Sequence, residues 1–369
     1  MKDLKLNILF GVLFLFLVVH LLFSPLYIIK DMPLNGYFET PAKPGLTVNN
    51  YFNKAFQDST EKYLKYNFGL FPGLTRIHNQ LEYSLFDKIN VHDVHKGKDG
   101  YLHRYVDNYF DGNSYADNVL NRFMDKFRRL NDTLEASGKK IIWVIAPDKS
   151  IVYNETLPEE IKLKEPINNY YSDFEKAIRK NKINFIDFNT LAIAEKNKYP
   201  FPPITKGGIH WCQAYAARCF DSLCKYMASI SDIKIDNKVN YYRTGNSWDP
   251  DYDIEYSANL LFHLEKNDTA YMAKIVSESN VKDKNLLLIG DSFCHAWMWS
   301  RMFEPCFSNE SEFWYYNRDA YKLDNTKIVR NAKKTSIRNY IRTFDVIIIE
   351  YSVANLEMLD YGFMNELEN

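Results

Sequence analysis

The chain has 369 residues and a formal net charge of −1, and hydrophobic residues make up 46% of it. This length and apolar content suit one large domain with additions or two smaller domains. The balanced charge offers no basic field for a phosphate backbone, and neither GxxxxGK[ST] nor GxGxxG occurs, so the sequence argues against a nucleic-acid partner and against a nucleotide site.

An almost wholly apolar segment, Leu6–Ile29, lies near the start of the chain. Its length matches a bilayer core of about 30 Å, and no small-x-small cleavage site follows it. We therefore expect residues 1–30 to form a cytoplasmic tip and an uncleaved, single-pass anchor in the inner (cytoplasmic) membrane. The alternative is a cleaved signal peptide. Both interpretations predict that the remaining chain lies outside the cytoplasm, in the periplasm.

The next stretch, residues 31–95, combines a linker with a helical region. Its first part carries several prolines and glycines, which is typical of a linker. Residues 49–89 then place apolar and charged side chains at helical spacing, and we interpret them as a helical collar between membrane and domain. The motif GKDGYL predicts a tight hairpin, because its Asp99-Gly100 pair readily adopts the positive φ that such a turn needs.

From Ser114 onward the pattern alternates between helices and buried strands. A helix is expected between a Ser114 N-cap and a stop at Gly138, since apolar residues recur there every three or four positions. Another is expected over residues 210–230. Short apolar runs predict strands at residues 141–147, 183–188, 286–290, 312–316 and 344–352. Such alternation indicates an α/β fold over residues 96–369, with a mostly parallel sheet covered on both faces.

The five cysteines do not suggest a metal site. Their odd number prevents complete pairing, and none shows the CxxC spacing of a zinc ribbon. We expect them to be buried, small apolar side chains, with one disulfide left open as an alternative in an oxidising compartment. Neither a metal nor an organic cofactor is indicated.

The tripeptide Gly290-Asp291-Ser292 ends one of the predicted strands. In open α/β sheets, ligands bind beyond the carboxyl ends of the strands, so Asp291 and Ser292 are expected at the rim of a site. A predicted helix begins beside Ser292, and its free N–H groups would stabilise an oxyanion during acyl transfer. The alternative is that Asp291 or Ser292 only caps this helix.

A serine nucleophile needs a base, and His210 is the leading candidate. It follows a Gly-Gly pair and precedes an apolar helix, which favours a place on the rim. The alternative is a half-buried histidine at a helix start. His295, three residues after Ser292, is the second candidate. The histidines before the α/β region are interpreted as surface or packing residues: His92, His95 and His103.

Several motifs, taken in order, resemble one known family. GIHW at residues 208–211, followed by GDSF at residues 290–293, resembles the alginate O-acetyltransferase family of SGNH-hydrolase-like proteins, of the AlgX and AlgJ type. Four further stretches resemble the same family in the same order: residues 97–102, 145–160, 313–318 and 345–356. The resemblance covers most of residues 50–360. It implies an SGNH-hydrolase-like three-layer sandwich, preceded by a transmembrane helix and a helical collar.

The resemblance also implies roles for individual residues. Ser292 would be the nucleophile that forms an acyl-enzyme, and His210 would remove its proton and then activate a sugar hydroxyl. The backbone N–H of Ser292 would be one oxyanion donor. Five further residues are candidates for the oxyanion site or its rim: Lys149, Asp291, Tyr316, Asn317 and Arg318.

One position departs from the family pattern. The family commonly has an Asp-x-His motif, in which the acid holds the imidazole tautomer and stabilises the imidazolium. Gly208 occupies the position of that acid. We expect Asp148 or Glu350 to replace it; otherwise turnover is slow, or catalysis has been lost.

Three functions are compatible with these residues. The first is a serine-dependent O-acetyltransferase for an exported or cell-surface polysaccharide, served by a membrane-bound O-acyltransferase, as the family resemblance implies. The second is a non-catalytic module that binds the glycan or docks onto the acyltransferase, which Gly208 favours. The third is a polysaccharide acetylesterase, which shares the chemistry of the first and differs only in the acyl acceptor.

Overall fold

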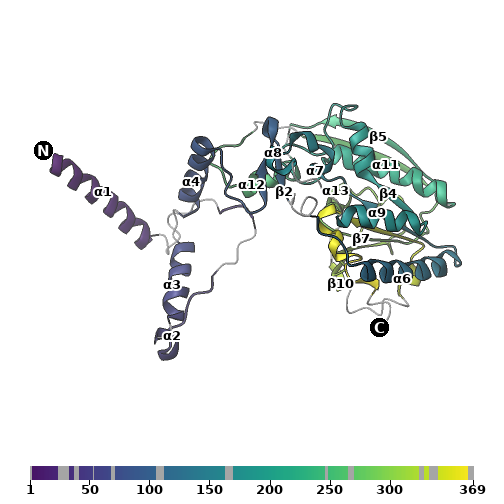
Figure 1. Ribbon diagram of the computed structural model, residues 1–369, viewed down its shortest axis with the longest axis horizontal. Helices are drawn as coiled ribbons and strands as arrows, with labels where there is room; N and C mark the ends of the chain where they lie inside the picture. The colour runs from purple at the N-terminus through teal and green to yellow at the C-terminus, as the bar shows by residue number, and fades with distance from the viewer. Residues whose placement is uncertain are drawn as a thin grey trace. The chain divides into compact units, whose positions relative to one another are not determined.

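The computed structural model divides the chain into two compact units (Figure 1). The first comprises Met1–His92 and Glu255–Leu264, and the second comprises Asp93–Ile254 and Glu265–Asn369. The residues that the structure describes are 2–23, 33–36, 41–52, 54–67, 71–104, 112–162, 169–245, 248–264, 270–323, 328–331 and 340–364.

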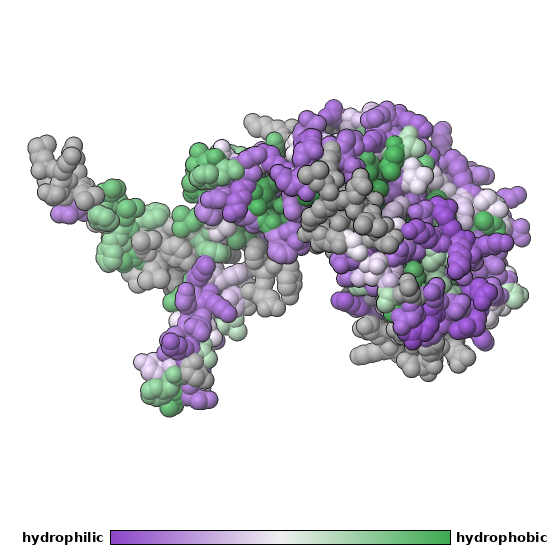
Figure 2. All heavy atoms as spheres, viewed as in Figure 1, coloured by the Kyte–Doolittle hydropathy of each residue, from purple (hydrophilic) through white to green (hydrophobic). Residues whose placement is uncertain are grey.

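The first unit is helical. Its elements are α1 (Lys2–Phe23), α2 (Val48–Phe52), α3 (Ala55–Tyr66) and α4 (Phe71–Phe86), which agrees with the helical pattern expected over residues 49–89. Exposed hydrophobic side chains gather on α1 between Ile8 and Phe16, as Figure 2 shows. Within the described residues, however, no helix meets the length and hydropathy needed to cross a membrane. The anchor predicted over residues 6–29 is therefore not confirmed, and residues 24–29 lie outside the described part.

The second unit is built on a mixed sheet of seven strands. Their order is β10-β9-β8-β7-β11-β3-β4, and the five strands from β8 to β4 run parallel while β9 and β10 are antiparallel. The strand bounds are β3 Lys140–Ile145, β4 Phe185–Asp187, β7 Leu286–Gly290, β8 Glu312–Tyr315, β9 Asp319–Lys322, β10 Ile328–Asn331 and β11 Val346–Tyr351. This confirms the mostly parallel α/β sheet that the apolar runs predicted.

Helices cover both faces of this sheet, which explains why its strands are apolar without alternation. Ile142 and Val144 on β3 pack with α10 (Phe188–Glu195), α11 (Gln213–Ile230) and α13 (Cys294–Trp299). The intervening residues of β3 pack with α6 (Asp117–Glu135) and α9 (Tyr170–Lys180). Figure 1 shows α11 and α6 on opposite sides of the strands. Each large apolar side chain buried in these layers contributes about 1.5–3 kcal/mol.

Two turns test the local sequence signals. The hairpin expected at GKDGYL is confirmed, because β1 (Val94–Lys96) pairs antiparallel with β2 (Leu102–Arg104). In the turn between these strands, Asp99 has a φ of 55° and Gly100 a φ of 80°. The Ser114 N-cap is wrong, because α6 begins at Asp117 with Ala116 as its N-cap. The expected stop is present, since Gly138 has φ of 74° just after the helix.

A second, two-stranded sheet had no counterpart among the predicted strands. It pairs β5 (Ile235–Arg243) with β6 (Tyr271–Ser279) in antiparallel register. The remaining short elements are α7 (Lys149–Val152), η2 (Lys98–Gly100), η3 (Asn154–Thr156), α8 (Glu159–Lys162), η4 (Asp249–Asp251), α12 (Asp253–Ser257), η6 (Ile341–Thr343) and η7 (Val353–Met358). All five cysteines are buried free thiols, as the apolar interpretation predicted.

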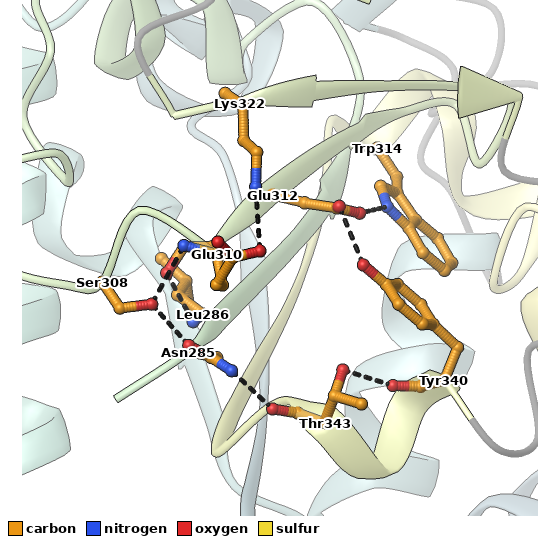
Figure 3. A network of polar contacts seen from close by, with 10 residues as sticks. Asn285, Leu286, Ser308, Glu310, Glu312, Trp314, Lys322, Tyr340 and Thr343 are labelled. Atoms are coloured by element: carbon orange, nitrogen blue, oxygen red, sulfur yellow. Dashed lines mark hydrogen bonds and ion pairs between the residues drawn. The ribbon is translucent and has the colours of Figure 1, made fainter. Parts of the chain in front are cut away.

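A polar network anchors the starting ends of β7 and β8 (Figure 3). The carboxylate of Glu312 accepts hydrogen bonds from Trp314 Nε1 at 2.8 Å and from the Tyr340 hydroxyl at 2.9 Å. Asn285, just before β7, donates to the carbonyl of Thr343 at 2.8 Å. These bonds fix the strands at the end remote from Gly290, so that the loops after the carboxyl ends project from a rigid base.

Candidate active site

Three side chains from separate segments form a hydrogen-bonded chain. The Ser292 hydroxyl follows β7 and lies 2.8 Å from His210 Nε2. The Nδ1 of the same imidazole lies 2.5 Å from Oδ2 of Asp253, the first residue of α12. A carboxylate at Nδ1 favours the tautomer protonated on that nitrogen, which leaves Nε2 as the acceptor for the serine proton. The arrangement is a Ser-His-Asp triad in geometry.

The loop that carries His210 and the loop that carries Asp253 are bonded along their length. Thr205 Oγ1 donates to the carbonyl of Asp251 at 2.5 Å, and the N–H of Ile254 donates to the carbonyl of Gly207 at 3.0 Å. The N–H of Ile209 donates to Oδ1 of Asp253 at 2.7 Å. This last bond uses the carboxylate oxygen that does not face the imidazole. Both oxygens of Asp253 are therefore fixed.

Gly208 is explained by this pairing of loops. A Cβ at position 208 would lie 2.4 Å from the carbonyl oxygen of Pro250 and 2.8 Å from Thr205 Oγ1. The acid of an Asp-x-His motif cannot be accommodated there, because the acid loop itself occupies the space. The loop instead delivers Asp253 to the imidazole.

The expectation that Asp148 or Glu350 replaces the family's acid is corrected, since neither contacts His210. Asp148 caps α7 through a bond from Ser150 N–H at 2.8 Å, and burial raises its pKa to about 6. Glu350 is buried beneath the nucleophile turn, where Oε2 accepts from the N–H of Asp291 and from the thiol of Cys294, both at 3.2 Å. Burial, followed by the nearby charge of Asp291, raises the pKa of Glu350 well above its usual range.

Asp291 positions the nucleophile turn. Its Oδ1 accepts from Phe293 N–H at 2.9 Å, and its Oδ2 accepts from the Ser352 hydroxyl at 2.6 Å and from Asn355 Nδ2 at 2.7 Å. A carboxylate that receives this many donors is an acceptor and not an oxyanion donor. Asp291 therefore ties the Gly-Asp-Ser turn to the loop that follows β11.

A pocket of about 400 Å³ is lined by Ser292, His210 and Asp253. Three of the rim candidates come from the segment after β8, and only one of them lines this pocket. Tyr316 lines this pocket with a φ of 49°, a strained value for an aromatic residue, and its hydroxyl lies 3.5 Å from Asn355 Nδ2. Asn317 is buried and donates to the carbonyl of Tyr361. Arg318 is exposed and lies over the ring of Tyr316. Only Tyr316 of these three faces the site.

Lys149 supports the histidine loop from within. It is 3% exposed, and its Nζ donates to the carbonyls of Leu102 and Lys206, both at 2.9 Å. Burial lowers the pKa of Lys149 to about 7, although the nearby carboxylates of Asp253, Asp148 and Asp251 act to raise it. Lys149 thus braces the loop before His210 and does not line the pocket itself.

Ser292 has a donor available for an oxyanion. Within the described residues, its backbone N–H makes no hydrogen bond to the protein, unlike the N–H groups of Phe293 and Cys294.

The second base candidate, His295, stacks on Trp299 with an angle of 8° between the rings and 4.8 Å between their centroids, and burial lowers the pKa of His295 to about 4. His295 is therefore a packing residue. Among the described residues, no group of three or more His, Cys, Asp or Glu side chains is arranged to hold a metal ion.

One family model matches part of the chain. Residues 94–234 match the model of the SGNH hydrolase-like domain of the acetyltransferase AlgX. This part of the chain is therefore similar to an AlgX-type SGNH hydrolase-like domain. The matched residues include His210, whereas Asp253 and Ser292 lie beyond them.

The solved structures to which this chain is similar are remote in sequence. The O-acetyltransferase domain of Pseudomonas putida AlgJ is 16% identical with a TM-score of 0.46, over 74% of this chain and 98% of that one. Pseudomonas aeruginosa AlgX is 15% identical with a TM-score of 0.47, over 76% and 68%. Bacillus cereus PatB1 is 12% identical with a TM-score of 0.39, over 70% and 95%. No curated protein matches the chain.

Proposed function

We propose that this protein is a serine-dependent O-acetyltransferase that moves an acetyl group onto hydroxyls of an exported or cell-surface polysaccharide. The observation that carries the proposal is the 2.8 Å contact between Ser292 Oγ and His210 Nε2, with Asp253 on the other imidazole nitrogen. The contact is within the range for direct proton transfer from a nucleophile to its base.

In the first half-reaction, His210 Nε2 takes the proton of Ser292 as Oγ attacks the carbonyl carbon of the acetyl donor. The resulting oxyanion is stabilised by the N–H of Ser292, and Tyr316, which lines the pocket, is a candidate for a second donor. Asp253 stabilises the imidazolium. The tetrahedral intermediate then collapses, and the donor's leaving group departs with the proton from His210, which leaves acetyl-Ser292.

In the second half-reaction, a sugar hydroxyl enters the pocket and transfers its proton to His210 as its oxygen attacks the acetyl carbon. Collapse of the second intermediate breaks the bond to Ser292 Oγ, which recovers its proton from His210. The acetylated sugar is released, and the site returns to its starting state. No group beyond the donor and the acceptor is required.

The two alternatives fare differently. A purely glycan-binding or docking module has no need of an ordered Ser-His-Asp arrangement, and Gly208, the feature that favoured it, is explained by the acid loop. An acetylesterase uses the same first half-reaction with water as the acceptor. The two enzymatic functions are separated by whether acetate or acetylated sugar is formed.

We also propose, from the apolar N-terminal sequence and the family resemblance, that the domain lies in the periplasm and receives its acyl group from a membrane-bound O-acyltransferase. A C-terminal alkaline phosphatase fusion tests the location, because this enzyme is active only after export. An inactive fusion that is stably produced would contradict it. Co-purification with a co-expressed membrane-bound O-acyltransferase tests the partner, and its absence from the purified protein would contradict the proposal.

The function is tested by labelling with a serine-reactive fluorophosphonate and by acetyl transfer from 4-nitrophenyl acetate. We expect wild type to be labelled and active, and Ser292→Ala and His210→Ala to lose both properties. Ser229→Ala is the matched control, since this exposed serine on α11 bonds only within its own helix. Equal labelling of wild type and Ser292→Ala would refute the proposal.

A further inference from the structure

A row of five aromatic rings leads away from the pocket of Ser292. It starts at the pocket wall and consists, in order, of Tyr316, Tyr315, His295, Trp299 and Trp248. Successive ring centroids in this row lie 4.7, 4.8, 4.8 and 5.8 Å apart. Each of the five residues keeps part of its surface exposed to solvent. We call this row the aromatic track, and its contacts make it continuous with the candidate active site.

The aromatic track is carried by the segments that position the triad. His295 and Trp299 lie four residues apart on α13, so they share one face of the helix that follows Ser292. A rise of about 1.5 Å per residue puts the Cα atoms of Ser292 and Trp299 about 10 Å apart along this turn and helix. Trp248 is the N-cap residue of η4, which leads to Asp253. The track therefore adjoins both the nucleophile turn and the acid loop.

The outer end of the aromatic track is exposed and held in position. Trp299 is 51% exposed, although tryptophan is a residue that folded proteins mostly bury. Its ring stacks on His295 at an interplanar angle of 8° and meets the ring of Trp248 at 72°. Burial lowers the pKa of His295 to about 4, so its imidazole is neutral at neutral pH. A contiguous, uncharged aromatic surface that is kept in solvent beside a pocket is typical of a ligand-binding surface.

The chemistry of the aromatic track favours a carbohydrate. A nucleic acid would find no cation among its five side chains. A lipid chain or an apolar helix needs one continuous apolar face, whereas the ring of Tyr315 is turned by 61° from that of Tyr316 and by 46° from that of His295. Each ring also carries a polar atom at its edge. A pyranose has an apolar C–H face and a rim of hydroxyls. Separate units of a glycan can therefore stack on differently oriented rings while their hydroxyls meet the polar edges.

We propose that the aromatic track binds successive pyranose units of the acceptor polysaccharide and so presents a hydroxyl of that chain to Ser292. Tyr316 belongs both to the track and to the pocket wall, so a chain that lies on the track reaches the pocket directly. This inference rests on the proposed function for the identity of the acceptor. It adds a binding surface that lies outside the pocket in which the acetyl group is transferred.

Binding is measured by calorimetry in the Ser292→Ala background, which removes turnover. Three series of oligosaccharides of increasing length serve as probes: neutral hexoses, N-acetylhexosamines and uronic acids. We expect Kd to fall with chain length in at least one series, and Trp299→Ala and Trp248→Ala should each raise Kd for the longer chains about tenfold. Trp299→Phe, which keeps an aromatic ring, should bind more tightly than Trp299→Ala. Tyr242→Ala is the matched control, because Tyr242 is also 51% exposed and lies on β5, outside the aromatic track.

The proposal is overturned if none of the series binds the parent protein, or if Trp299→Ala and Trp248→Ala bind as tightly as Tyr242→Ala. Loss of a co-purifying acyltransferase in Trp299→Ala, with sugar binding unchanged, would assign the aromatic track to a protein partner and also refute it. The proposed function is judged separately, by hydrolysis of 4-nitrophenyl acetate in wild type against Ser292→Ala. Serine-dependent hydrolysis without an effect of Trp299→Ala on sugar binding would refute the track alone. Trp299-dependent binding without serine-dependent hydrolysis would support a sugar-binding surface and refute the catalytic proposal.

Discussion

Replacing Asp253 by asparagine isolates the contribution of the carboxylate at nearly constant shape. In the native structure Oδ2 faces His210 Nδ1 at 2.5 Å while Oδ1 accepts from Ile209 N–H at 2.7 Å. An asparagine has one oxygen for these two tasks. If that oxygen stays on Ile209, the amide NH₂ faces Nδ1 and forces the imidazole into the tautomer protonated at Nε2. Nε2 then cannot accept the proton of Ser292.

The expected loss follows from this tautomer. An orienting aspartate that is replaced by asparagine in a serine triad costs about 10⁴ in kcat, which corresponds to about 5.4 kcal/mol of transition-state stabilisation. Asp253 is partly exposed, so solvent offers the variant some compensation, and we expect a loss of 10³–10⁴ in Asp253→Asn. The melting temperature should change little, because the bond from Ile209 can survive.

The assay is single-turnover acetylation of Ser292 by 4-nitrophenyl acetate, with protein integrity checked by circular dichroism. Asp249→Asn is the control, since this exposed acid lies on the same loop and outside the residues that line the pocket. A variant Asp253→Asn that keeps more than one tenth of wild-type acetylation would refute the triad assignment. So would a loss of equal size in Asp148→Asn with Asp253→Asn unaffected.

Three further predictions follow from buried contacts. Gly208→Ala should lower activity about a hundredfold and destabilise the fold, because the new Cβ would clash with the carbonyl of Pro250. Gly245→Ala is the control and should keep wild-type kinetics, because a Cβ at position 245 has open space around it. Glu350→Gln should unfold in urea within about 1 kcal/mol of wild type, because burial raises the pKa of the native carboxyl and so favours the neutral form that glutamine mimics. A loss of several kcal/mol would contradict this. His103 is fully buried, and burial lowers its pKa to about 3. Below pH 6.5 the unfolded chain therefore binds a proton on this imidazole that the folded protein does not bind. The free energy of unfolding should fall by up to about 5 kcal/mol between pH 6.5 and pH 3. Urea unfolding across that range should show a flatter profile in His103→Gln; an unchanged profile would place the acid sensitivity elsewhere.

The sheet was predictable because its strands are buried on both faces. Leu286–Gly290 is an unbroken apolar run, and its observed bounds coincide with the predicted ones. The pair β5–β6 was missed because one of its faces is exposed, so polar residues interrupt the apolar signal along Ile235–Arg243. The Ser114 cap failed for a local reason, since Ala116 takes the extended φ and ψ that precede α6 without a side-chain bond.

Ser292 and His210 could be identified from sequence because each has a local signal, a strand end and a helix start. Asp253 could not, because it lies 43 residues after His210 and is one of several acids in a short segment. Nothing in the spacing of Asp249, Asp251 and Asp253 indicates which of them reaches the imidazole. Only the bonds between the two loops, which depend on the tertiary fold, select Asp253.

The glycine at position 208 changes how the reactive group is assembled. In an Asp-x-His motif, acid and imidazole are neighbours and arrive together whenever a single turn forms. In this protein the imidazole acquires its counter-ion only after a distant stretch of backbone has docked against it. A local displacement of the loop that carries Asp253 would therefore lower the reactivity of Ser292 even if Ser292 and His210 kept their positions.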